Sequence, residues 1–260
     1  MGVGEKETVS GMRQQTRVLR MPVDVTSCSD AVNRIASWIG PGASHYVCVS
    51  NVHMCMEVWD DREYEGVLIA ADLVVPDGRP IYWAQKLLGV NSAVQVRGSE
   101  LASAIFSYAN RQCIPVGFYG GTQETLDRLK IVVRDKYPNM PAPLFISPPF
   151  RVLTPDEKEA DIVAINNSSV EILFVGLGCP KQERWMAELQ PHLSCTLLGV
   201  GAAFDFIAGT QKHAPKIFQV LGLEWLFRLF CEPRRLWRRY LSTNPRFIWY
   251  FSGQLMGRNY

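Results

Sequence analysis

Short apolar runs alternate with helix-length segments through most of the chain, and this alternation limits the fold more than any other feature. The runs suit buried strands and cover residues 45–50, 72–77, 115–120, 144–147, 171–178 and 195–201. Segments long enough for helices lie between them, at residues 54–69, 99–111, 122–137, 154–166 and 181–189. Strands connected by such helices form a mostly parallel sheet that helices cover on both faces. The sequence therefore predicts an α/β fold.

The chain has the size and composition of one globular body with an appendage. It contains 260 residues, of which 47% are hydrophobic and 20% charged, which is typical of a folded protein. We expect a flexible polar leader at residues 1–20, an α/β catalytic core at 21–210, and an appendage of two or three short helices at 211–260. Seven cysteines without a CxxC pair indicate reduced thiols in a protein that faces the cytosol. No segment is apolar and long enough to span a bilayer.

The appendage is basic, although the whole chain is close to neutral. Residues 211–260 contain nine Lys or Arg and two Glu, whereas the other 210 residues contain eighteen basic and twenty-three acidic groups. Such a tail favours an anionic partner, such as lipid headgroups or a pyrophosphate. No nucleic-acid reader motif is present, so we expect no nucleic-acid partner.

One segment of the appendage predicts an amphipathic helix. At 100° per residue, four arginines share one side, and apolar or aromatic residues take the other. Trp and Tyr beside Arg suit a membrane interface, while a helix docked on the core with a solvated basic face fits the same pattern. The arginines are Arg234, Arg235, Arg238 and Arg239; the opposite side holds Leu236, Trp237, Tyr240 and Leu241.

Glycine-bearing turns follow three of the predicted strands. Pro180 opens a helix after the strand 171–178, so Lys181 and Gln182 lie among the free amides of its first turn, a suitable phosphate cradle. Gly120 and Gly121 follow the strand 115–120. Asp205 lies in the third loop, at 199–209, where its carboxylate could bind ribose or cap a helix. Three such turns at neighbouring strand ends indicate a nucleotide crevice, although each also suits an ordinary strand-to-helix turn.

A carboxylate ends the predicted strand 72–77. Asp77 is a common turn residue, yet α/β enzymes place catalytic side chains at this position, and it could remove a proton from an attacking hydroxyl. Ser50 and Asn51 end the preceding strand and suit hydrogen bonds to a sugar, and Arg97 suits a phosphate. No metal-ligand set is visible, so a leaving diphosphate would be stabilised by helix termini and Arg or Lys.

Several ordered strings resemble the WecG/TagA/CpsF family, glycosyltransferase family 26, over about residues 18–245. They are SNVHM (50–54), ADLVVPDG (71–78), VRGSEL (96–101), GFYGGT (117–122), FVGLGCPKQE (174–183), GVGAAFDFIAG (199–209), APK (214–216) and GLEWLFRLFCEPRRLWRRYL (222–241).

The resemblance implies a Rossmann-like core and an inverting, metal-independent transfer from a UDP-sugar to a polyprenyl-diphosphate-linked sugar. It implies no cofactor beyond the donor substrate. The donor sugar would be N-acetylmannosamine, its uronic acid or glucose, in cell-surface polysaccharide or exopolysaccharide synthesis. The appendage would hold the enzyme on the inner face of the cytoplasmic membrane, with self-association as a further expectation.

The resemblance also assigns roles to residues. Asp77 corresponds to the catalytic base, Ser50 and Asn51 to the sugar site, Arg97 and Gln182 to substrate or diphosphate contacts, and Asp205 to a nucleoside contact. An Asp with an ordinary pKa of about 3.9 is a weak base, so we expect a late proton transfer. The tail arginines would complete the site.

Two other functions fit part of this pattern. A nonenzymatic, nucleotide-binding scaffold of polysaccharide assembly would share the fold and the tail. A nicotinamide-dependent oxidoreductase is disfavoured, because no acidic residue follows a GxGxxG turn at the expected distance.

Overall fold

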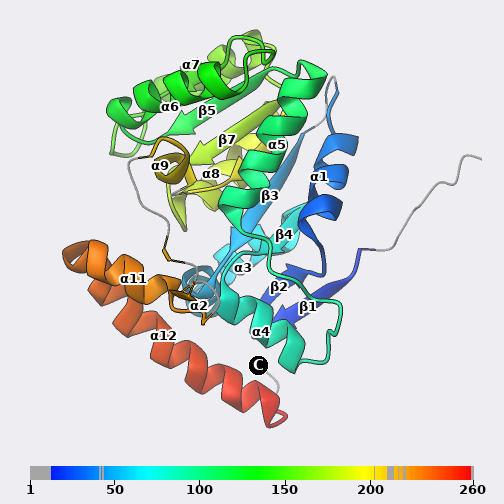
Figure 1. Cartoon of the computed structure of the whole chain (residues 1–260), viewed down its shortest axis with the longest axis vertical. Helices are drawn as coiled ribbons and strands as arrows, with labels where there is room; N and C mark the ends of the chain where they lie inside the picture. Colours follow the sequence, from blue (N-terminus) through cyan, green and yellow to red (C-terminus); the bar gives the residue numbers. More distant parts are fainter. Residues whose placement is uncertain are drawn as a thin grey trace, which may run out of the picture.

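The computed structural model describes residues 13–40, 42, 44–201, 203–209, 214, 215, 217, 218 and 221–258. Its centre is a six-stranded, all-parallel sheet with the strand order β4-β3-β8-β7-β5-β6 (Figure 1). The strands are β3 (His45–Ser50), β4 (Leu73–Pro76), β5 (Val116–Gly120), β6 (Leu144–Ile146), β7 (Ile172–Gly176) and β8 (Thr196–Gly199). All six predicted strands are present, which confirms the α/β fold.

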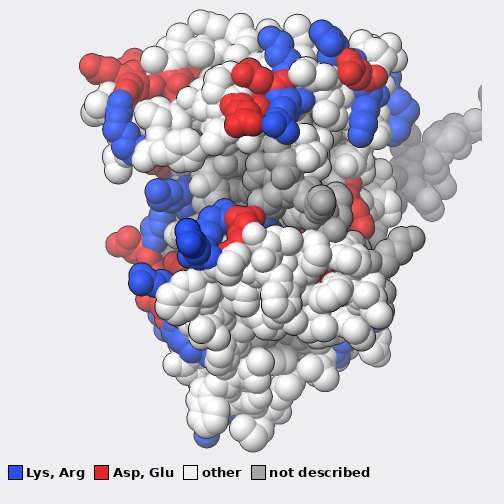
Figure 2. All heavy atoms as spheres, turned by 60° about the vertical axis from the view of Figure 1, so that its left-hand side comes forward, with Lys and Arg blue, Asp and Glu red and all other residues white. Residues whose placement is uncertain are grey.

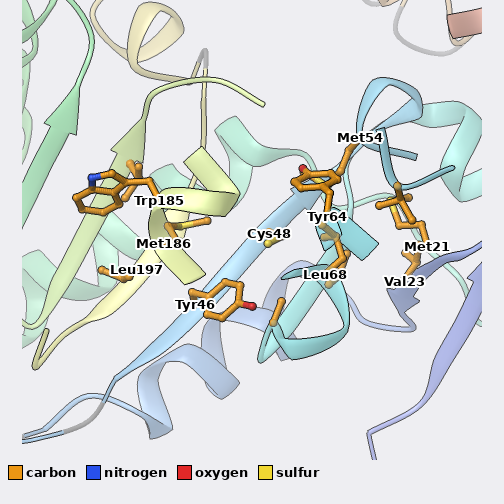
Figure 3. Packing of buried hydrophobic residues seen from close by; sticks show 14 of the residues in the cluster. Met21, Val23, Tyr46, Cys48, Met54, Tyr64, Leu68, Trp185, Met186 and Leu197 are labelled. Carbon is orange, nitrogen blue, oxygen red and sulfur yellow. The ribbon is translucent and has the colours of Figure 1, made fainter. Parts of the chain in front are cut away.

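Side chains along each strand alternate between two cores. On β3, Tyr46 and Cys48 belong to one buried cluster, whereas Val47 and Val49 belong to the other, as a repeat of two predicts. Figure 3 shows Tyr46 and Cys48 among residues of the neighbouring helices. One face is covered by α1 (Cys28–Ser37), α5 (Gly98–Gln112) and α6 (Gln123–Lys136), and the other by α3 (Arg62–Ala70), α7 (Pro155–Asn167) and α8 (Lys181–Leu189). Helices therefore cover both faces, as predicted.

The helical segment expected at 54–69 is two helices. α2 (Val52–Asp60) is followed directly by Asp61. The carboxylate of Asp61 caps α3 by accepting hydrogen bonds from the amides of Glu63 and Tyr64. This cap is the local reason for the break. Among the described residues, four helical segments were not expected: α1, α4 (Arg79–Leu87), the 3₁₀ turn η1 (Gln190–His192) and α9 (Ala203–Ile207).

The prediction of a flexible leader over 1–20 is wrong for residues 15–20. There the chain forms an antiparallel hairpin from β1 (Gln15–Val18) and β2 (Met21–Asp24). The Asp24 carboxylate accepts a 2.7 Å hydrogen bond from the amide of Val74 on the edge strand β4. Arg20 is buried and forms an ion pair with Glu65. In the sequence this segment looks polar, because the partners of its charges, such as Glu65, lie far along the chain and are not visible locally. Residues 1–12 lie outside the described part of the structure.

The appendage contains α11 (Glu224–Cys231) and α12 (Pro233–Leu255). The expectation that every helix in it is short is wrong, because α12 continues through Pro245 for 23 residues. Phe247 and Phe251 are buried in the core cluster, and Tyr250 stacks on Trp59 of α2 with ring centroids 4.4 Å apart. This packing after Pro245, together with the buried Leu236 before it, holds the helix beneath the body (Figure 1). Within the described residues, none of the helices combines the length and the hydropathy needed to cross a membrane.

Candidate functional site

Asp77 follows β4 directly and lies at the carboxyl edge of the sheet. Its amide donates to the carbonyl of Ser50 at the end of β3, 3.0 Å away. Its Oδ1 accepts a 2.7 Å hydrogen bond from the amide of Gly98, the first residue of α5. The Gln95 side chain donates to the Asp77 carbonyl at 2.5 Å. The end of β3 and Gln95 therefore fix the backbone of Asp77, and the N-terminus of α5 fixes its carboxylate.

The environment of Asp77 makes it a stronger base than an ordinary Asp. Burial raises the pKa of Asp77 to about 6, and the negative charge of Glu224 acts in the same direction. The hydrogen bond from Gly98 and the positive charges of Arg228 and Arg97 lower this pKa in part. The expectation of an ordinary pKa is therefore wrong, because the carboxylate loses solvent at the edge of the sheet. Above about pH 6 it is ionised and able to accept a proton.

The two residues that end β3 differ in their surroundings. Asn51 caps α2 by accepting a 3.1 Å hydrogen bond from the amide of Met54. A Cβ added at Gly78 would lie 3.4 Å from Asn51, so Asn51 packs on the turn that follows Asp77. Ser50 is fully buried, and its hydroxyl donates to the Val75 carbonyl at 2.8 Å. The structure thus brings Asn51 to Asp77, whereas the Ser50 hydroxyl ties β3 to β4.

Arg97 connects the body with the appendage. Its Nη1 donates to Glu100 of α5 at 2.8 Å, and its Nε donates to Glu224 of α11 at 3.3 Å. One turn further along α11, the guanidinium carbon of Arg228 lies 5.4 Å from the ring centroid of Phe206. The charges of Glu224 and Arg228 affect the pKa of Asp77 in opposite directions. The appendage therefore reaches the site through Glu224 and Arg228.

The sequence analysis missed Glu224 and Arg228. Their signal is an acidic and a basic residue four positions apart in the otherwise apolar segment 221–231. This spacing puts both side chains on one face of a helix. The Nε atom of Arg228 is buried and has no hydrogen-bond partner among the described residues.

The predicted arginines of the tail do not act as one group. Arg239 is partly buried, and its charge reaches His53, whose pKa burial lowers to about 4. Arg234, Arg235 and Arg238 are exposed, and Arg235 forms an ion pair with Glu232. The predicted amphipathic helix is present as part of α12, but the body covers only part of its apolar side. Because α12 docks through Leu236, its neighbours Trp237 and Leu241 face outward beside Arg234 and Arg238.

The glycine turns after β5 and β7 have a packing reason. A Cβ at Gly176 would lie 2.6 Å from the ring of Phe204, which α9 places over the strand ends. A Cβ at Gly120 would lie 2.7 Å from the Gly176 carbonyl, and both Gly120 and Gly121 have positive φ angles of 110° and 77°. Small residues are therefore needed here whether or not a nucleotide binds. Contact of Gly120 and Gly121 with a nucleotide stays a prediction.

In the predicted phosphate cradle at α8, the Gln182 side chain is already hydrogen-bonded within the protein. Gln182 is only 3% exposed; its Oε1 accepts from the amide of Gly178 at 3.3 Å, and its Nε2 donates to buried Glu183 at 2.5 Å. It shapes the loop between β7 and α8, whereas Lys181 is exposed. The Asp205 side chain lies outside the described part of the structure.

A cavity of about 470 Å³ opens next to the Asp77 region, between α5, α6 and α9. It begins at the first turn of α5, immediately after Arg97 and Gly98, and its size suits a small-molecule ligand. Its lining is mixed, with three hydroxyls, a charge of each sign and two aromatic rings: Ser99, Glu100, Ser103, Val132, Lys136, Tyr137, Phe206 and Ile207.

Among the described residues, no three His, Cys, Asp or Glu side chains are grouped so that they could hold a metal ion. This finding concerns protein ligands only, so transfer without a metal stays a prediction.

A parallel sheet with a raised-pKa carboxylate and arginines at its carboxyl edge is typical of an α/β enzyme with a site for an anionic substrate. The sequence matches the glycosyl transferase WecG/TagA/CpsF family over residues 16–260. The chain belongs to this family, whose members are glycosyltransferases of cell-surface polysaccharide synthesis. The match includes the hairpin, the sheet and the whole appendage.

Proposed function

We propose that the protein is an inverting, metal-independent glycosyltransferase that moves a sugar from UDP to a polyprenyl-diphosphate-linked sugar. The observation that carries the proposal is Asp77, a partly buried carboxylate whose pKa of about 6 suits a general base. Asn51 lies next to it, and the two arginines that influence it, Arg97 and Arg228, suit the diphosphate of a donor.

The reaction is a single displacement. Asp77 takes the proton from the acceptor hydroxyl while the hydroxyl oxygen bonds to the anomeric carbon. The bond from this carbon to the UDP oxygen breaks on the opposite face, so the configuration inverts. Arg97 and Arg228 stabilise the negative charge that develops on the departing diphosphate.

The donor occupies the edge of the sheet between Asp77 and the cavity beside α5. In this proposal Asn51 binds the sugar, while Lys181 and the turn at Gly120 and Gly121 surround the diphosphate, and Asp205 contacts the nucleoside. Gln182 shapes the loop beside the diphosphate. The buried hydroxyl of Ser50 ties β3 to β4 and is not part of the proposed sugar site. The donor is UDP-N-acetylmannosamine, its uronic acid or UDP-glucose.

The appendage places the enzyme on the inner face of the cytoplasmic membrane, where the lipid-linked acceptor lies. The exposed face of α12 carries apolar and aromatic side chains with Arg234 and Arg238 at one end, a composition that favours an anionic lipid surface. Figure 2 shows a broad uncharged surface in the lower part of the molecule, where α11 and α12 lie. The exposed apolar residues of this face are Trp237, Leu241, Ile248, Trp249, Leu255 and Met256.

A turnover assay with purified protein tests the proposal. UDP release is measured with each UDP-sugar, with and without a synthetic lipid-diphosphate-sugar acceptor, in the presence of EDTA. We expect release that requires both donor and acceptor, persists in EDTA, and is lost in Asp77→Asn. Binding of UDP without turnover on any pair would favour a nonenzymatic scaffold, and loss of turnover in EDTA would refute the metal-independent mechanism.

A further inference from the structure

Glu224 is the first residue of α11, yet its carboxylate lies at the edge of the body. It is bound by Nε of Arg97, while Glu100 binds Nη1 of the same side chain. Two carboxylates on different nitrogens fix the plane of a guanidinium group. Arg97 directly precedes Gly98, whose amide holds the Asp77 carboxylate. Three links therefore connect Glu224 with Asp77: one ion pair, one peptide unit and one hydrogen bond.

The position of α11 depends on contacts of this kind. None of its residues is buried, although most are partly covered. Its apolar side is shared with α12, where the ring of Trp225 lies 5.7 Å from that of Tyr240. The pair between Arg97 and Glu224 joins the helix to the catalytic edge, and Arg228 on the same face rests over Phe206. These two contacts orient α11 over the site.

We propose that Glu224 is a positioning residue of the transfer reaction, which orients Arg97 and keeps a negative charge beside the Asp77 carboxylate when the appendage is docked. The inference rests on the proposed function of Asp77 as the base. It gives the appendage a role in the chemistry that differs from membrane attachment: the Glu224 carboxylate of α11 makes Asp77 a stronger base.

The charges around Asp77 explain the expected direction. Arg97 from the body and Arg228 from α11 favour the ionised carboxylate, as does the amide of Gly98, whereas Glu224 opposes ionisation. Asn51 and Gln95, which also lie close to Asp77, are neutral. Removal of the Glu224 charge alone therefore lowers the pKa of Asp77, which weakens the base but keeps it ionised at lower pH.

The pH dependence of kcat/KM in Glu224→Gln tests the proposal. We expect a lower rate near neutral pH and an acid limb that moves to lower pH. The ratio of kcat/KM at about pH 5.5 to that at about pH 7.5 should rise about twofold or more. Glu224→Asp, which keeps the charge, should retain an acid limb close to that of the wild type. Glu100→Gln is the matched control, because it removes the other partner of Arg97 without a charge that influences Asp77.

A second measurement does not depend on turnover. The difference in Tm between the wild type and Asp77→Asn, followed from about pH 4 to pH 8, reports the ionisation of Asp77 in the folded protein. In a Glu224→Gln background, the midpoint of this difference should move to lower pH. If the midpoint shifts as expected but no sugar transfer is detected, the effect of Glu224 on the pKa of Asp77 stands and the proposed function is refuted.

Two outcomes would overturn the inference. One is an acid limb and a Tm midpoint that stay unchanged in a folded Glu224→Gln protein. The other is an equal shift in Glu100→Gln, which would show that Glu224 has no specific effect on Asp77.

Discussion

The two ends of the appendage contact the body in different ways. The C-terminal half of α12 is anchored: Phe247 and Phe251 are buried, Arg246 forms a two-point ion pair with Asp60, and Gln254 bonds to the hairpin at Leu19. By contrast, α11 has no buried residue, and it reaches the site through charged side chains. Apolar burial supplies most of the free energy of docking. We infer that one end of the appendage provides stability and the other provides groups for chemistry.

This division is typical of enzymes, in which groups that serve the reaction are often poorly placed for stability. Asp77 is an example, because its raised pKa means that the fold disfavours its ionised form. Changes at the site end should therefore affect rate more than stability, and changes at the anchored end should do the opposite.

The largest effect is expected for Asp77→Asn. Turnover should fall about 100-fold to 10,000-fold, the usual contribution of a general base, with little change in UDP binding. The fold should become more stable above pH 6. Asn can still accept from the Gly98 amide, and the neutral side chain avoids a cost of up to about 3 kcal/mol for ionising a group of pKa about 6.

The sign of this effect depends on pH. A carboxyl with a raised pKa binds its proton more tightly in the folded state, so the free energy of unfolding of the wild type falls as pH rises from about 4 to 6. The advantage of Asp77→Asn should be absent near pH 4 and complete above pH 6 to 7, as measured by thermal melts. Unchanged turnover in a folded variant would remove Asp77 from the mechanism.

At the anchored end, Phe251→Ala should mainly affect stability. The ring is 7% exposed and stacks on Phe247 with centroids 5.6 Å apart, and Phe-to-Ala changes in cores cost about 3–5 kcal/mol. We expect increased hydrogen exchange along α12 and a lower Tm. Activity should fall only in proportion to the fraction of molecules in which α11 is undocked from the site. Excess lipid-linked acceptor favours the docked form and should restore part of the activity. A variant with full stability and no activity would break the proposed division.

The sequence predicted the sheet well for a physical reason. Strands of a covered parallel sheet are apolar on both faces, so the runs at 45–50 or 195–201 are visible without any partner. The hairpin at β1 and β2 has no such run, and its charges at Arg20 and Asp24 are satisfied by Glu65 and Arg13. Such pairing is a property of the fold and is not visible locally.

The candidate site likewise contains residues that the local sequence predicts and residues that only the folded chain brings together. Asp77 and Asn51 were predicted because they end consecutive strands, and parallel strands bring their carboxyl ends to one edge. Glu224 and Arg228 were missed because they reach this edge only when the appendage folds back over 127 residues to Arg97. The raised pKa of Asp77 was missed for the same reason, since burial and Glu224 produce it together.

The outward face of α12 should affect membrane binding and not chemistry. Trp249 is 70% exposed, and burial of a large apolar side chain in the membrane interface contributes about 1.5 kcal/mol or more. Trp249→Ser should weaken binding to anionic vesicles about tenfold in a sedimentation assay and leave the rate on a water-soluble acceptor unchanged. Phe150→Ser, which removes another exposed aromatic ring from the body, is the matched control and should not change vesicle binding. Equal effects of both variants would argue against α12 as the membrane face.

The smallest effect is expected for Arg246→Gln, within the anchored end itself. The pair with Asp60 has good two-point geometry, but its side chains are 39% and 51% exposed. Such pairs contribute about 1 kcal/mol or less and weaken in salt. Urea denaturation should therefore show a small loss, reduced further at high salt, and a double-mutant cycle with Asp60→Asn isolates the pair itself. A coupling energy above about 2 kcal/mol would mean that charge, and not the burial of Phe247 and Phe251, holds the appendage to the body.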